Sequence, residues 1–463
     1  MFAKQRKLIL LLILAAPSIV QALPFQDARH LLNRTGFTAS QVEVDELSSL
    51  DRRSAVDHLI RKAASDFLHP LPDWHDEPLP DRRQLRKAGA EKKKALRKLN
   101  RKRGMELKGW WYRQMVESDS PLAERMTLFW HNHFTSSLKK VNLPQLMLRQ
   151  HLLLRGEALG DFSAMLHAVA RDPAMLIYLD SRNNRKKQPN ENFARELLEL
   201  FTLGEGHYSE QDIKEAARAF TGYAIDRDSG EFTLRQRQHD QGAKRFLGRT
   251  GRWGGEDIVN ILLENPRSAE FISRKLWDEF ITLDPAPGQM ESISNEFRRG
   301  GFHIGRLLGM VLMSDQFWDQ RNRGSRIKSP VELLVGTMRF FDIPADDGNL
   351  LARTGRNLGQ NLFDPPNVKG WPGGEAWIDS NTLLARRQVI ERLTQGREMK
   401  RGKKRNMASR MMRQRISMQP DTPDQRRRLQ QLLLPLPPVN DPDAENLADY
   451  LRQQLLDPVY QLN

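Results

Sequence analysis

Apolar residues recur at spacings of three and four through most of the chain, which is the pattern of amphipathic helices. Serine–proline pairs at Ser120-Pro121 and Ser329-Pro330 combine an N-cap residue with a proline in the first turn, so each indicates a helix start. Further helices are expected over residues 256–264, 267–280, 289–298, 305–318 and 375–393. The pattern predicts an all-α, multi-helix globular domain.

Strand signals are confined to two short segments, residues 231–235 and 244–247. The turn-forming residues 239–242 lie between them, so we expect the two segments to pair as a small β-hairpin.

The segment 190–204 has an apolar face and a polar face of acids, amides and an arginine. Glu196 and Glu199 are like charges three residues apart, and they repel unless a proton, an arginine or a metal lies near them. A salt-bridged or buried polar face and a functional site both fit this pattern. The candidate polar site, completed by downstream residues, is Asn190, Asn192, Arg195, Glu196, Glu199, His207, His239 and Asp240.

The first residues have the composition of a targeting segment. Lys4 and Lys7 precede an apolar run over residues 8–16, and Val20-Gln21-Ala22 is a small-residue cleavage pattern. This order predicts a secretory signal peptide over residues 1–22 and an exported protein, periplasmic or extracellular. The chain has no cysteine, which excludes disulfides, thiol nucleophiles and thiolate metal ligands.

Much of the formal net charge of +15 falls in two stretches. The first, at about 82–104, is expected to be a basic insertion between helices. The second lies in residues 396–463, expected to be a basic, proline-dotted extension, helical or partly disordered, that buries little and is dispensable for folding. Both stretches fit solvated arms or contacts to an anionic envelope surface. The expected export argues against nucleic acid.

A divalent metal is the candidate cofactor, with His131, Glu196, His207 and His239 as candidate ligands. His133 is two residues from His131, so on a helix the two imidazoles point to different sides and His133 is expected in the core. His239 and Asp240 form a histidine–carboxylate pair of the kind that orients a ligating imidazole.

The segment 363–377 contains three prolines and three glycines, so it is expected to form a rigid loop. Its tryptophans either present a surface to a partner or ligand, or plug the core. The candidate residues of this loop are Asp364, Lys369, Trp371, Glu375 and Trp377.

Four stretches, residues 129–134, 190–223, 239–248 and 363–377, resemble in order and spacing the bacterial domain-of-unknown-function family numbered 1800. The resemblance covers residues 27–395. It implies a mostly helical, exported protein, often encoded beside a second exported protein that looks like the alkaline-phosphatase superfamily. The basic insertion and the C-terminal extension look additional to the family pattern.

Two functions follow as hypotheses. The first is an accessory protein or binding scaffold for the co-encoded phosphatase-superfamily-like protein. The alternative is a metal-dependent hydrolase that acts on an envelope polymer, which depends on the histidines and carboxylates named above. The chain shows no nucleophile elbow, phosphate loop or dinucleotide fingerprint.

Overall fold

The computed structural model describes residues 22–64, 69–81, 84, 87–226, 229–395 and 407–463. Apart from Ala22, the expected signal peptide lies outside these ranges. The described chain begins with α1 (Phe25–Thr35), α2 (Gln41–Ser48), α3 (Arg52–Ala64), α5 (Ala90–Glu117), α6 (Pro121–His133), α7 (Leu138–Val141), α8 (Pro144–Gly156), α9 (Phe162–Arg171) and α10 (Pro173–Tyr178).

The middle of the chain contains the strands and the distinctive segment 190–204. Its elements are the 3-10 turn η1 (Ser181–Asn183), α11 (Asn192–Glu196), the π-helical turn η2 (Leu197–Thr202), α12 (Glu210–Ala219), β1 (Tyr223–Ile225), β2 (Phe232–Leu234), η3 (Gln236–Gln238), β3 (Lys244–Phe246) and β4 (Arg249–Gly251).

The remainder is again helical. Its elements are α13 (Gly255–Glu264), α14 (Pro266–Phe280), α15 (Gln289–Arg299), α16 (Ile304–Leu312), α17 (Asp315–Trp318), η4 (Gln320–Asn322), α18 (Pro330–Phe340), α19 (Gly348–Asn357), η5 (Gly374–Trp377), α20 (Ser380–Gln395), α21 (Met407–Ser417), α22 (Pro423–Leu433), α23 (Leu447–Leu456) and η6 (Pro458–Gln461).

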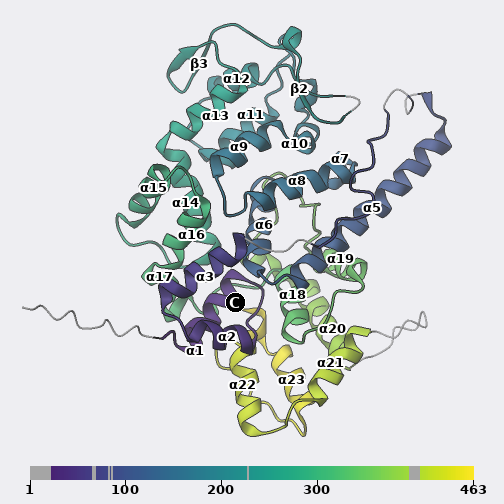
Figure 1. Ribbon diagram of the computed structural model, residues 1–463, viewed down its shortest axis with the longest axis vertical. Helices are drawn as coiled ribbons and strands as arrows, with labels where there is room; N and C mark the ends of the chain where they lie inside the picture. The colour runs from purple at the N-terminus through teal and green to yellow at the C-terminus, as the bar shows by residue number, and fades with distance from the viewer. Residues whose placement is uncertain (1–21, 65–68, 82–83, 85–86, 227–228, 396–406) are drawn as a thin grey trace, which may run out of the picture.

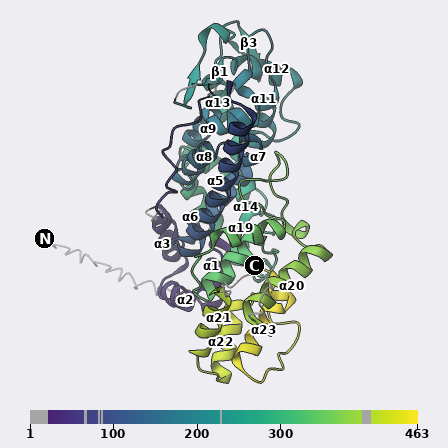
Figure 2. The same cartoon turned by 90° about the vertical axis from the view of Figure 1, so that its right-hand side faces the viewer.

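The predicted all-α class is confirmed. The helices form an elongated body with α12 and β3 at one end and α22 and α23 at the other (Figures 1 and 2). Helix α18 starts as expected, with a capping box between Ser329 and Glu332. The helix expected over 305–318 is broken at Met313–Ser314 into α16 and α17. Within the described ranges, every helix is too short or too polar to span a lipid bilayer.

The predicted pairing of the two strand segments is wrong, although both segments do form strands. Strand β2 pairs antiparallel with β1, and β3 pairs antiparallel with β4, so they belong to separate two-stranded sheets. Gly222 explains the first pairing, because its positive φ of 85° and its hydrogen bond from Arg235 turn the end of α12 directly into β1.

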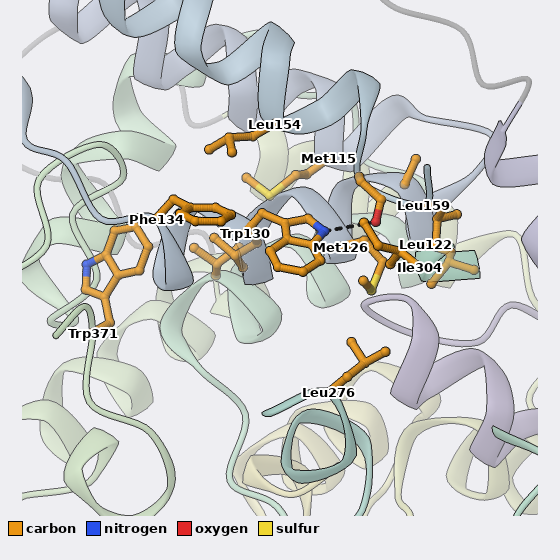
Figure 3. Packing of buried hydrophobic residues seen from close by; sticks show 14 of the residues in the cluster. Met115, Leu122, Met126, Trp130, Phe134, Leu154, Leu159, Leu276, Ile304 and Trp371 are labelled. Carbon is orange, nitrogen blue, oxygen red and sulfur yellow. Dashed lines mark hydrogen bonds between the residues drawn. The ribbon is translucent and has the colours of Figure 1, made fainter. Parts of the chain in front are cut away.

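Helix α6 runs through the centre of the core (Figure 3). Trp130 is fully buried, and its indole Nε1 donates to the carbonyl of Ala158 at 2.9 Å. Met115 of α5, Leu154 of α8, Leu276 of α14 and Ile304 of α16 pack in the same cluster. The other labelled side chains come from α6 and from loops: Leu122, Met126, Phe134, Leu159 and Trp371. Helix α6 leads directly into the turn over residues 134–137. It therefore positions the loops that contact this turn and are described below.

The C-terminal segment packs on this body, so the expectation that it buries little is wrong for residues 407–463. The Leu432–Leu434 run is buried, and Arg29 of α1 donates to the carbonyls of Leu434 at 2.6 Å and Pro435 at 3.0 Å. The hydroxyls of Tyr460 and Thr337 lie 2.7 Å apart. Burial of the leucines that repeat along this segment favours packing more than its positive charge opposes it. Residues 396–406 lie outside the described residues.

Candidate functional site

The helix over 192–202 changes type halfway along. After α11 the backbone widens into η2, where the amide of Leu203 donates to the carbonyl of Leu198 at 2.9 Å, a spacing of five residues. The hydroxyl of Thr202 donates to the carbonyl of Leu197 at 2.6 Å and supports the same wide turn. Isolated π-helical turns occur frequently at functional sites.

Glu196 is the last residue of α11, directly before this turn, and Glu199 lies on the turn; both are half-buried. The phenol of Tyr208 donates to Glu199 Oε2 at 3.1 Å. Burial and then the charge of Glu199 raise the pKa of Glu196, while Arg195 and Lys369 oppose the rise. Among the described residues Glu196 has no hydrogen-bond partner. The structure therefore holds an unbonded carboxylate, directly before a rigid turn, beside a second acid.

Two tyrosines border this acid pair. Burial and then the charge of Glu196 raise the pKa of Tyr178, and burial, aided by the hydrogen bond to Glu199, raises the pKa of Tyr208 to about 12. Lys369 Nζ lies 3.4 Å from Glu205 Oε1, and both side chains are largely exposed. We call Glu196, Glu199 and Glu205 the acidic edge.

The rest of the predicted polar site faces elsewhere. Arg195 turns to α12, where it makes two hydrogen bonds to Glu210 at 2.8 and 2.9 Å, and these bonds raise its pKa. Asn192 is exposed, and its backbone amide donates to the side chain of Asn190 at 2.9 Å. The backbone amide of Asn190 in turn donates to Asn184 Oδ1 at 2.9 Å. These residues hold the chain around the helix start.

His239 and Asp240 do not form the expected pair. His239 Nδ1 shares a hydrogen bond with the carbonyl of Thr221 at 2.8 Å. Asp240 accepts from Arg218 Nε at 2.8 Å, and this hydrogen bond lowers the pKa of its carboxyl. Both residues tie the turn after β2 to the end of α12. His207 is exposed on the loop before α12.

The four candidate metal ligands are not brought together. Within the described part of the chain no three His, Cys, Asp or Glu side chains meet in an arrangement that holds a metal ion. His131 Nε2 lies 3.1 Å from His151 Nδ1, and both rings are buried against Trp111 and Phe363. Burial lowers the pKa of His131 to about 3. His133 is buried as expected and bonds the carbonyl of Phe201 at 3.2 Å.

His151 is a partner that sequence reasoning missed. It lies on α8, twenty residues after His131, and nothing in the sequence around it indicates a contact with that distant histidine. The two imidazoles form a closed, neutral pair inside the core.

The loop 363–377 plugs the core rather than presenting its tryptophans. Trp371 and Trp377 are 5% and 6% exposed. Asp364 accepts from Lys108 Nζ at 2.7 Å, from Ser137 Oγ at 2.9 Å and from the Lys139 amide at 2.8 Å.

Gly370 brings the same loop against α6. It has a φ of 91°, and a Cβ there would lie 2.2 Å from Asn132 Oδ1, which accepts from the Trp371 amide at 2.7 Å. Of the candidate residues of this loop, Lys369 and Glu375 are exposed. Lys369 reaches the acidic edge, so this loop and the π-helical turn meet at one surface.

A family model described as "Protein of unknown function (DUF1800)" matches residues 30–462. The match includes the basic insertion and continues through the C-terminal segment, past residue 395, where the resemblance in the sequence motifs stops. No curated protein and no solved structure matches the chain. The match spans nearly the whole sequence, and the chain therefore belongs to the DUF1800 family of proteins of unknown function.

Proposed function

We propose that this protein is an exported binding scaffold whose acidic edge receives a basic side chain of a partner protein. The observation that carries the proposal is Glu196, a half-buried carboxylate without a hydrogen-bond partner among the described residues. A half-buried charge is stabilised by an opposite charge that arrives with a partner. Glu199 adds a second acid at the same place, so the edge attracts cations.

Other candidate residues, from the polar site and from the loop 363–377, support a scaffold. Arg195, Asp240 and Asp364 each make two or more hydrogen bonds to other parts of the fold. They hold the π-helical turn and the loop 363–377 in place. The neighbour implied by the family resemblance, an exported protein of the alkaline-phosphatase superfamily type, is the first candidate partner. No observation favours the alternative of a metal-dependent hydrolase, because its candidate metal ligands do not lie together in the fold.

Purification of the tagged protein from gently lysed native cells tests this proposal. Wild type is expected to retain a partner, and Glu196→Gln with Glu199→Gln is expected to lose it. The matched control is Glu291→Gln with Glu296→Gln, which removes two exposed acids from α15 and should retain the partner. Recovery of wild type as a lone monomer, or equal retention by both variants, contradicts the proposal.

Melting of the same variants separates binding from folding. The raised pKa of Glu196 means that folding disfavours its charged form, so Glu196→Gln is expected to leave the melting temperature unchanged or slightly higher. A marked loss of stability would instead assign Glu196 to the structural framework. Export itself is tested by N-terminal sequencing of the mature protein, with cleavage expected after Ala22.

A further inference from the structure

The first half of α5 is a cationic rod that extends away from the helical body (Figure 1). We use this name for residues 90–103. Its cations Lys92, Lys94, Arg97, Lys98 and Arg101 are exposed. None of the five forms an ion pair within the described residues. The only acid of the rod is Glu91.

The cations cover more than half of the helix circumference. Lys94, Arg97, Lys98 and Arg101 follow a spacing of three, four and seven residues, so they form one continuous stripe. Lys92, Lys93 and Lys102 flank this stripe, at about 100° per residue. The remaining side of the rod carries Leu96 and Asn100, which line a pocket against α7 and α8.

This charge is unfavourable for the rod itself. Lys92, Lys93 and Lys94 lie in the first turns of α5, where the helix dipole favours acids. Like charges three or four residues apart along the stripe repel each other. An anionic ligand relieves both effects.

The rod keeps its helical shape because its base is anchored. Arg103 forms an ion pair with Glu77, and its guanidinium lies 5.8 Å from the centre of the Trp74 ring. Trp74 Nε1 donates to Glu106 Oε2 at 3.0 Å. The second half of α5 is buried through Leu107 and its following aromatic residues. The cations are therefore presented on a rigid support.

We propose that the cationic rod binds a flexible acidic polysaccharide. A flexible chain can follow cations around more than half of a helix, whereas a planar bilayer meets only one side. Leu99, 40% exposed, is the only large apolar side chain that the rod exposes, so membrane insertion has little to drive it. The rod contains no aromatic residue on which nucleic-acid bases could stack. The proposal assumes the expected export, which determines the compartment in which the rod meets its ligand. It does not depend on the acidic edge.

Binding of fluorescent polyuronate oligomers to the full mature chain, measured by anisotropy over a range of salt concentrations, tests this inference. Replacing Lys94, Arg97, Lys98 and Arg101 by Gln is expected to weaken binding at least about tenfold and to reduce the salt dependence. The matched control also replaces four exposed cations by Gln, and these lie elsewhere in the fold: Arg245, Arg252, Arg298 and Arg306. The control should bind within about twofold of wild type.

Three results would overturn the proposal. Wild type without measurable affinity for polyuronate at low salt would exclude the ligand class. Equal weakening in the control would show attraction by net charge alone. Preferential binding to vesicles of anionic phospholipid, lost in the stripe variant, would assign the rod to a membrane. An unchanged melting temperature of the stripe variant ensures that lost binding is not lost folding.

Discussion

The two basic stretches of the chain look alike in composition and differ completely in the fold. On the cationic rod Lys92, Lys94, Arg97, Lys98 and Arg101 are exposed and form no ion pair among the described residues. On α22, Arg426 makes two hydrogen bonds to Asp421 at 2.6 and 3.0 Å, and its guanidinium lies 5.3 Å from the ring centre of Tyr450. Arg427 pairs with Asp424 on the same helix.

The difference has a local origin that composition conceals. Around α22 the C-terminal stretch places Asp421 five residues before Arg426 and Asp424 three residues before Arg427. Leucines then follow at helical spacing, at residues 429, 432 and 433. Over residues 92–103 the rod has no acid, and its only leucines are Leu96 and Leu99. A charge run that also carries acids and periodic apolar residues is therefore a packed helix, and one without them is a free surface.

The strongest test of this contrast is removal of residues 407–463. The truncated protein is expected to lose cooperative thermal unfolding, measured by circular dichroism. Truncation exposes the surface against which the C-terminal leucines pack, and it removes the carbonyl partners of Arg29 and the amide of Asn463 that donates to Glu332 at 3.0 Å. A sharp transition at the wild-type temperature would show that the segment is an appendage after all.

Single leucines from the two stretches should behave in opposite ways. Leu433→Ala removes a side chain that is 3% exposed, so we expect a loss of about 2–5 kcal/mol in the free energy of unfolding. Leu99→Ala on the rod removes one that is 40% exposed, and a change within about 0.5 kcal/mol is expected. Urea denaturation measures both. Similar losses would contradict the contrast.

Lysines from the two regions should differ in their dependence on pH. Lys328 is buried beneath the C-terminal turn η6, where Nζ donates to the carbonyl of Tyr460 at 2.9 Å, and burial lowers its pKa from 10.5 to about 7. Between these values the unfolded chain binds more protons. The burial of Lys328 therefore destabilises the fold most below about pH 7. Between about pH 7 and 10.5 the free energy of unfolding rises with pH, by at most about 1.4 kcal/mol per pH unit.

Lys328→Met is expected to remove that rise, whereas Lys94→Met on the exposed rod should leave it intact. Unfolding free energies measured from pH 6 to 10 on the wild type and both variants provide the comparison. Parallel curves for wild type and Lys328→Met would show that the buried ammonium has no such role.

The smallest expected effects concern single arginines. Arg426→Gln breaks a bidentate ion pair at a partly exposed site, and a small loss of stability is expected. Arg97→Gln removes repulsion along the stripe, so a gain of a few tenths of a kcal/mol is expected. Thermal melts of each variant beside the wild type show whether stability falls or rises. Losses of stability of equal size in both variants would mean that Arg97 has a partner.

Local signals predicted most of the helices. Capping at Ser329 and the turn at Gly222 follow from neighbouring residues alone. Contacts between distant residues were beyond such signals: β2 pairs with β1 rather than with β3, and Arg29 contacts Leu434 from more than four hundred residues away. At the candidate site the sequence identified Glu196 and Glu199, but Glu210, the partner that draws Arg195 away, lies on the next helix.

The contacts of Arg29 also affect the order of events during synthesis. Its partners on α22 are made 402 or more residues later, which takes about 20–80 seconds at roughly 5–20 residues per second. Until then α1 lacks the carbonyls that receive its guanidinium. This part of the body, around α1, therefore closes only after the C-terminal helices have been added to the chain.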